Sequence, residues 1–343
     1  MKKKLILLTM VTLAGFSLIG CNAKPSDFDG DEKQTAYEKL QEVTLNEVAH
    51  SIFYAPQYVA IEEGYFEEEG IRLNLVTGFG ADKVLTALIS GEADIGFMGA
   101  ESTIYAYQEG AADPVVNFAQ LTSRAGNFVV AREADPDFTW EDLIGKEVLG
   151  GRKGGMPEMV FEYVLKEKGI DPQKDLKINQ SIDFGSTAAA FSGGQGDYTI
   201  EFEPSATILE KEGNGYVVAS VGTESGYVPY TSYSAKKSYL EANTELIQRF
   251  TNALQKGMDY VQTHTPQEIA SVIAPQFAET DEDTIVTIVE RYYEQETWKS
   301  NLIFEQDSFD LLQDILESAG ELEERVPYEE IITTEYAKKS VTS

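Results

Sequence analysis

Strand-like and helix-like segments alternate along the chain from Val43 onward, and this alternation constrains the fold more than any other feature. Residues 43–48, 71–75 and 93–98 have the alternating or continuous apolar pattern of β-strands. A helix between the first two begins at Pro56 and ends at Gly64, since proline suits the start of a helix and glycine its end. Strands that alternate with helices predict an α/β fold with a mostly parallel sheet between helices.

A second series of the same kind begins near Phe128. We expect strands at 147–149, 176–178, 198–202 and 216–221, with helices between them. From Glu241 the pattern is mainly helical, with Thr-Pro-Gln-Glu at 265–268 as the capping box of one helix, and we expect this tail to pack on the first series. The chain has 343 residues, enough for two hydrophobic cores. We therefore predict lobe I from residues 43–128 and 231–343, and lobe II from residues 129–230.

Residues 1–20 have the form of an export signal. Three lysines follow Met1, and the apolar run at 5–19 is too short to span a bilayer comfortably. The residues at 18–21, Leu-Ile-Gly-Cys, resemble the lipobox of bacterial lipoproteins. The resemblance implies a cleaved signal peptide and lipidation of Cys21, including palmitate, so that the lipid anchors an extracytoplasmic protein to the cell membrane. The alternative is a cysteine that only happens to lie at the end of a signal.

Residues 21–42 are polar and acidic, and we interpret them as a flexible tether between lipid and domain. The whole chain has 58 acidic and 27 basic residues, a net charge of -31. This balance excludes a nucleic acid as partner, because phosphate binding needs clustered Lys and Arg. It also requires that membrane attachment come from the lipid and not from electrostatics.

The residue types argue against an enzyme. The chain has two histidines, His50 and His264, and one cysteine, Cys21, which the lipobox assigns to lipid. A Ser-His-Asp or Cys-His site would need one of these histidines, and each has an ordinary structural explanation. Neither a Cys or His cluster with metal-ligand spacing nor a nucleotide-binding fingerprint is present. We predict no metal, no cofactor and no catalysis.

Ligands of open α/β sheets bind at the carboxyl ends of the strands, where loops lead into helices. We expect six such loops to converge on one cleft if the two series face each other: 50–56, 77–82, 99–102, 154–157, 185–187 and 201–204. Glycine in these loops permits close backbone approach to a ligand.

Four short stretches of the sequence resemble a known family. The run Ser-Ile-Phe-Tyr-Ala-Pro-Gln-Tyr-Val-Ala at 51–60, Glu-Gly-Tyr-Phe at 63–66, Gly-Glu-Ala-Asp-Ile-Gly at 91–96 and Phe-Glu-Pro at 202–204 are similar to solute-binding proteins of ABC importers. The branch includes binders of nitrate, alkanesulfonate, taurine and thiamine-pyrimidine precursors. The resemblance implies a two-lobed, type II periplasmic-binding-protein clamshell, a small-molecule ligand between the lobes, and ABC permease and ATPase subunits as partners. We expect a monomer.

The chain departs from the anion binders of this family. Many relatives have a tryptophan in the turn before the second-lobe proline, where this chain has Phe202. Acidic residues also lie in or beside the expected cleft loops, namely Glu101, Asp183, Glu201 and Glu203. Carboxylates repel a sulfonate at low effective dielectric, whereas they accept N–H bonds from an amino-heterocycle that aromatic rings can stack on. We therefore predict a pyrimidine-like or other amino-heteroaromatic solute. The ligand-binding residues we expect are Phe53, Tyr54, Phe79, Glu101, Ser102, Gly155, Met156, Thr187, Phe202 and Glu203.

Several alternatives stay open. Phe53 and Phe202 are equally explained as core residues, and Glu201 as a solvated or helix-capping acid. Arg152 and Lys153 precede a helix and would suit a phosphate or carboxylate, or else remain solvated. An alkanesulfonate, taurine or nitrate is the alternative ligand. A thiamine-pyrimidine-forming enzyme and a non-transporting sensor lipoprotein are the alternative classes.

Overall fold

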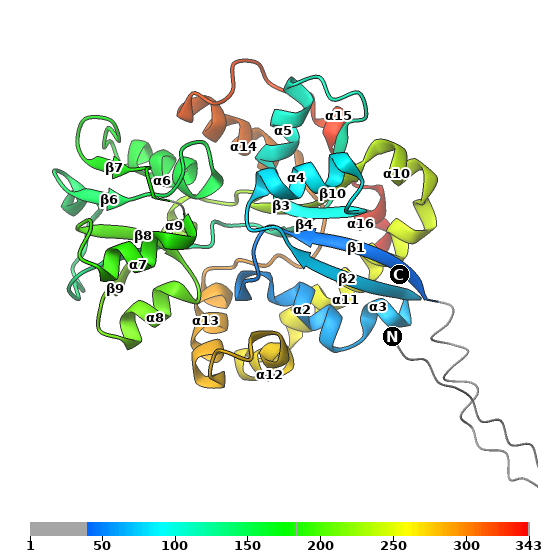
Figure 1. The fold of residues 1–343 in the computed structure, drawn as a ribbon, viewed down its shortest axis with the longest axis horizontal. Helices are drawn as coiled ribbons and strands as arrows, with labels where there is room; N and C mark the ends of the chain where they lie inside the picture. Colours follow the sequence, from blue (N-terminus) through cyan, green and yellow to red (C-terminus); the bar gives the residue numbers. More distant parts are fainter. Residues whose placement is uncertain (1–39, 183, 342–343) are drawn as a thin grey trace, which may run out of the picture. The chain divides into compact units, whose positions relative to one another are not determined.

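The computed structural model describes residues 40–182 and 184–341, and within them two five-stranded sheets (Figure 1). The signal segment, Cys21, almost all of the tether and Asp183 lie outside the described residues. The first sheet has the order β2-β1-β3-β10-β4, and the second β7-β6-β8-β5-β9. The strands of the first are β1 (Gln41–Glu47), β2 (Ile71–Thr77), β3 (Ile95–Gly99), β4 (Val115–Thr122) and β10 (Thr231–Lys236). Those of the second are β5 (Asn127–Ala131), β6 (Glu147–Leu149), β7 (Lys177–Asn179), β8 (Tyr198–Phe202) and β9 (Tyr216–Ser220).

Each sheet is parallel except for one strand, so the predicted mostly parallel arrangement is confirmed. In the first sheet β10 runs antiparallel to β3 and β4, and in the second β5 runs antiparallel to β8 and β9. These two strands adjoin the segments that cross between the sheets, since β5 follows the first crossing and β10 follows the second. The chain therefore enters the second sheet through β5 and returns to the first through β10, and each of these strands is fourth in the order of its sheet.

Strand β10 is the main element that the sequence pattern does not predict. It lies in the middle of the first sheet, yet its residues include Thr231, Ser232 and Ser234, all buried. Side-chain hydrogen bonds satisfy these hydroxyls; Ser232 Oγ donates to Asn117 Oδ1 at 2.6 Å. A strand whose buried groups are small, polar and paired within the sheet has no apolar run to reveal it.

Helices flank the first sheet and continue into the tail (Figure 1). They are α2 (Ala55–Glu62), α3 (Tyr65–Glu68), α4 (Ala81–Ser90), α5 (Glu101–Gln108), α10 (Lys237–Ala242), α11 (Thr244–Thr263), α12 (Pro266–Ile273), α13 (Glu282–Glu294), α14 (Gln306–Ala319), α15 (Tyr328–Ile331) and α16 (Glu335–Ser340). Helix α12 begins with the capping box expected from its sequence, in which Thr265 and Glu268 hydrogen-bond each other's backbone. None of the helices in residues 40–182 and 184–341 is both long and apolar enough to cross a membrane.

The second sheet carries α6 (Met156–Glu167), α7 (Thr187–Ser192), α8 (Ser205–Lys211) and α9 (Val221–Glu224). Four short 3-10 helices complete the set: η1 (Ile52–Tyr54), η2 (Trp140–Leu143), η3 (Phe184–Ser186) and η4 (Ala274–Phe277). The tail packs against elements of both sheets, and not only against those of the first sheet. Helix α14 packs on α6, and Arg291 of α13 pairs with Glu203 beyond β8. One apolar cluster accordingly extends from the first sheet through the tail to the second.

Candidate functional site

The first cleft loop leaves β1 through a fully buried carboxylate. Glu47 accepts hydrogen bonds from Gln57 Nε2 and Tyr58 Oη, both at 2.8 Å, and from His50 Nδ1 at 2.9 Å. The other ring nitrogen of His50, Nε2, lies 2.8 Å from the carbonyl oxygen of Gln276. Both ring nitrogens therefore face acceptors, and the hydrogen bond to Glu47 raises the pKa of His50 above its ordinary value. This network fixes the loop that follows.

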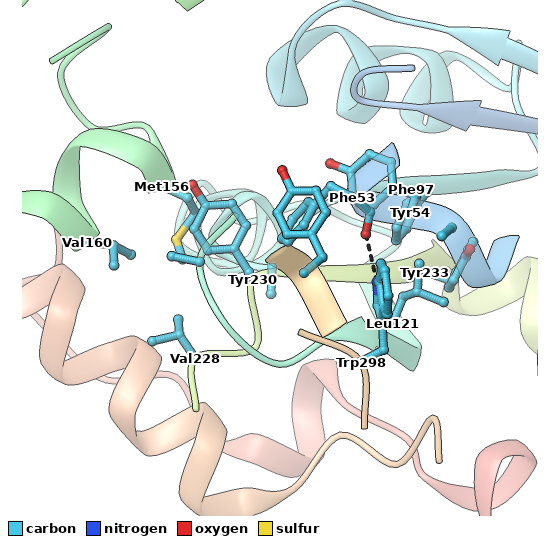
Figure 2. Close-up of a cluster of buried hydrophobic side chains, with 14 of the residues drawn as sticks. Phe53, Tyr54, Phe97, Leu121, Met156, Val160, Val228, Tyr230, Tyr233 and Trp298 are labelled. Carbon is cyan, nitrogen blue, oxygen red and sulfur yellow. Dashed lines mark hydrogen bonds between the residues drawn. The ribbon is translucent and has the colours of Figure 1, made fainter. Parts of the chain in front are cut away.

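That loop places Phe53 and Tyr54 on the 3-10 helix η1. Ser51 begins this helix and its Oγ accepts from the Phe53 N–H. The same Oγ donates to the carbonyl oxygen of Glu203 at 3.1 Å, a direct contact between the loop and the end of β8. Trp298 Nε1 donates to the Phe53 carbonyl at 2.9 Å, which Figure 2 shows as a dashed line. The backbone of Phe53 is thus held by Ser51 within its own loop and by Trp298 from the tail.

Aromatic rings from both sheets' units meet around Phe53. Its ring centroid lies 5.6 Å from that of Phe202 and 5.7 Å from that of Tyr230, both in edge-to-face geometry. Gly126, in the first crossing segment, makes the first of these contacts possible, since a Cβ there would lie 2.6 Å from both Phe53 and Phe202. Figure 2 shows Met156 on one side of Tyr230, with Phe53 and Tyr54 on the other.

Glu101 brings a carboxyl group to this cluster. It is the first residue of α5, its side chain is 4% exposed, and its Oε2 has no hydrogen-bond partner among the described residues. The carboxyl lies over Gly99, where a Cβ would come within 2.1 Å of it. Burial raises the pKa of Glu101 to about 7, although backbone N–H groups at the helix start and the charge of Arg152 oppose the shift. Burial first, and then neighbouring groups that include Glu101, raise the pKa of Tyr54 and of Tyr230, which places both tyrosines within electrostatic reach of Glu101.

The loop before α6 contacts the first sheet's unit through Tyr105. Tyr105 Oη of α5 donates to the Gly154 carbonyl at 3.3 Å and lies 3.6 Å from the sulfur of Met159. Gly155 is partly buried and Met156 is buried, and the charge of the exposed Arg152 acts on Glu101. Elements of the two sheets are therefore in contact at Tyr105 as well as at Phe53.

A second buried carboxyl group lies in the second sheet. Glu201 of β8 accepts from Thr199 Oγ1 at 2.6 Å and also bonds the Thr187 side chain. Burial raises the pKa of Glu201 to about 7. Beside it on β5, Asn127 is fully buried, and its Oδ1 has no partner among the described residues. Asn127 and Phe202 are paired across the sheet, so this amide lies next to the aromatic cluster.

Glu203 is placed differently from the other predicted residues. Its carboxylate accepts from the Thr207 N–H at 2.9 Å and from Arg291 Nη1 at 2.7 Å. Arg291 also pairs with Glu210. Protein groups occupy this carboxylate, and it serves as an anchor between the tail and β8. Removal of Glu203 would leave Arg291 partly buried and short of one partner.

The structure brings most of the predicted site residues together. Phe53, Tyr54, Glu101, Met156 and Phe202 surround or adjoin Tyr230, and the buried Ser102 and Thr187 lie at the first turns of α5 and α7. Phe79 does not join them, because it is 73% exposed on the loop after β2. Sequence reasoning missed Tyr230 and Asn127. Both adjoin the crossing segments, where only a knowledge of the sheet order reveals their neighbours.

Two open hollows lie elsewhere, along the edge strand β9. Their volumes are about 510 and 390 Å³, and they share Val218, Ala219, Ser220 and Thr223. Neither contains a buried polar atom that lacks a partner. We therefore take the aromatic cluster as the candidate site, because Glu101, Asn127 and Tyr230 in or beside it each have a buried polar atom without a partner among the described residues. Within residues 40–182 and 184–341 no group of three or more His, Cys, Asp or Glu side chains has the geometry of a metal site.

Comparison with known proteins agrees with this geometry. The family described as NMT1/THI5 like matches residues 52–269, more than half of the chain. The chain belongs to the NMT1/THI5-like family. The resemblance to solute-binding proteins is confirmed at this level, since one relative, "Putative binding protein YtlA" of Bacillus subtilis (strain 168), is 46% identical over 306 residues. The match covers 89% of this chain and 91% of YtlA.

Two more distant proteins are also similar to this NMT1/THI5-like protein. The 4-amino-5-hydroxymethyl-2-methylpyrimidine phosphate synthase of Aspergillus parasiticus is 24% identical over 219 residues, 61% of this chain and 63% of that protein. The solved structure of the periplasmic aliphatic sulphonate binding protein SsuA from Escherichia coli has a TM-score of 0.68 at 17% identity, covering 84% of this chain and 96% of that one. The second likeness confirms the predicted periplasmic-binding-protein fold.

Proposed function

We propose that this protein is an extracytoplasmic solute-binding component of an ABC importer, and that its solute is a small amino-heteroaromatic molecule such as a pyrimidine. The observation that carries the proposal is the Glu101 carboxyl group, buried beside aromatic rings from both sheets, with Oε2 unpartnered among the described residues. A flat ring can stack on Phe53, Tyr54 or Tyr230 while an exocyclic amine donates to Glu101.

The charges at the site favour this ligand class over an anion. Glu101 and Glu201 are both buried near the cluster, and Arg152, the cation whose charge acts on Glu101, is exposed. A sulfonate or nitrate is an anion that offers only hydrogen-bond acceptors. An ionised Glu101 would therefore repel it. The Aspergillus relative, named for a pyrimidine phosphate, supports the same class.

Binding and release, not catalysis, is the activity we infer. His50 is held by Glu47 and Gln276, and His264 stacks on Tyr260 with centroids 3.6 Å apart, away from the cluster. Neither histidine is positioned to activate a nucleophile there. YtlA, whose name is that of a binding protein, supports this inference.

The remaining features complete the proposal. We infer lipidation at Cys21, a tether to about residue 42, and a monomer that meets the ABC permease and ATPase subunits at the membrane surface. The lobes we infer are residues 43–128 with 231–343, and residues 129–230. Labelled palmitate should enter the wild-type protein and not Cys21→Ser, and equal labelling of both would exclude the anchor at this residue.

The ligand class is tested by isothermal calorimetry and thermal shift with 4-aminopyrimidines, flavins, alkanesulfonates, taurine and nitrate. We expect stabilisation by the aminopyrimidines, about 2.7 kcal/mol at a hundred times the Kd. The other compounds should leave the Tm unchanged. Binding of sulfonates or nitrate in place of aminopyrimidines would refute the ligand class while leaving the transport role intact.

A further inference from the structure

Tyr230 is a buried tyrosine whose hydroxyl is not used by the protein. The residue is 4% exposed, and Oη has no hydrogen-bond partner in the part of the chain that the structure describes. Other buried tyrosines differ. Tyr233 Oη donates to Gln57 Oε1 at 2.8 Å, and Tyr292 Oη to the Gly126 carbonyl at 3.0 Å. Because buried polar groups are nearly always paired, an unpaired hydroxyl points to a partner from outside the chain.

The position of Tyr230 indicates what that partner is. The residue lies in the second crossing segment, directly before β10, and its ring packs edge-on against Phe53 and Phe202. It therefore contacts the first cleft loop and the end of β8 at once. Glu101 lies within electrostatic reach of the Tyr230 hydroxyl, and burial raises the pKa of this hydroxyl well above the ordinary range. At neutral pH the group is therefore protonated and can donate a hydrogen bond.

We propose that Tyr230 is a specificity-determining residue, whose hydroxyl donates to a ring nitrogen while Glu101 accepts from the adjacent exocyclic amine. This inference rests on the proposed function and deepens it. Together the two groups select solutes that present an acceptor beside a donor on one edge of an aromatic ring. An anion would satisfy Tyr230 but not an ionised Glu101, and an aromatic amine without a ring nitrogen would satisfy Glu101 but not Tyr230.

Calorimetry with two probes separates the two roles. The probes are 4-amino-5-hydroxymethyl-2-methylpyrimidine and the same compound without its amino group. Tyr230→Phe should weaken both probes by the same factor, about three- to tenfold, because each keeps the ring nitrogen. Glu101→Gln should change the affinity for the amino compound only. The apo Tm of Tyr230→Phe should equal or exceed that of the wild type, since the variant loses an unpaired buried hydroxyl.

Tyr233→Phe is the matched control. It removes a hydroxyl that is paired within the protein, so it should lower the apo Tm and leave the affinity for both probes unchanged. If Tyr230→Phe binds both probes as tightly as the wild type, the inference about Tyr230 is wrong. If neither probe binds the wild-type protein, the proposed ligand class itself fails, and the role of Tyr230 fails with it.

Discussion

Glu101 combines its proposed binding role with a cost to stability, and the two can be measured separately. Its pKa is raised to about 7 from an ordinary value of 4.5, because burial disfavours the charged form. The folded protein therefore holds a proton that the unfolded chain releases. Stability falls as the pH rises from 4.5 to 7, and the loss is complete above pH 7.

Glu101→Gln should remove this dependence. Relative to the wild type, the variant should gain up to about 3 kcal/mol in the free energy of unfolding at pH 8 and little at pH 5. Urea unfolding at the two pH values measures this. The same variant should bind the aminopyrimidine more weakly. A variant that is less stable than the wild type at pH 8 would show that Glu101 is a structural residue.

Gly126 is the residue on which the contact between Phe53 and Phe202 depends. A Cβ at this position would lie 2.6 Å from each ring, so Gly126→Ala should force the rings apart and cost roughly 1–3 kcal/mol of stability. Ligand affinity should fall with it, because both rings line the site. Thermal unfolding and calorimetry measure the two effects. Gly185→Ala, where a Cβ would meet no atom within 4 Å, is the control for stability, which it should leave unchanged.

At the scale of elements, α6 carries a pair of buried carboxyl groups directly behind the cleft loop. Glu158 and Glu162 lie one turn apart, 2% and 5% exposed. Glu158 accepts from the Gly154 N–H at 3.2 Å and from Gln180, while Glu162 accepts from Gln173 and lies 3.8 Å from Lys166. Burial, and then the neighbouring Glu162, raises the pKa of Glu158 to about 8.

Glu162→Gln tests this pair. The wild-type pair holds a proton that the unfolded chain loses above about pH 4.5, so its contribution to stability falls as the pH rises toward 8. The variant has no second carboxylate to repel Glu158, and its Tm should decline less between pH 6 and 9. Identical declines in both proteins would assign the pH dependence to other groups.

The sequence predicts elements well where apolar residues mark them and poorly where polar residues are paired inside. The strand at 147–149 and the capping box of α12 are found where expected, because an apolar run and a Thr-Pro-Gln-Glu motif act locally. Strand β10 is missed because its hydroxyls are satisfied by distant partners such as Asn117. Glu203 illustrates the same limit at the site, since its partner Arg291 lies 88 residues away.

At the scale of the whole molecule, the elements of the two sheets touch on both sides of the aromatic cluster. Tyr105 contacts Gly154 at one side, and Arg291 links the tail to Glu203 at the other. The Arg291 pair is partly buried and hydrogen-bonded at 2.7 Å, whereas the Tyr105 hydroxyl makes longer contacts, with the Gly154 carbonyl at 3.3 Å and the Met159 sulfur at 3.6 Å. Under the proposed function, a ligand that bridges the cluster favours the arrangement of the two sheets that it binds more tightly.

The central claim is that an aminopyrimidine binds among Phe53, Tyr230 and Glu101. A crystal structure of the protein with 4-amino-5-hydroxymethyl-2-methylpyrimidine tests it most directly. We predict that the ring stacks on an aromatic side chain of this cluster, with its amine about 2.7–3.2 Å from Glu101 Oε2. A pyrimidine bound in the hollows along β9, or one whose amine points away from Glu101, would contradict the account.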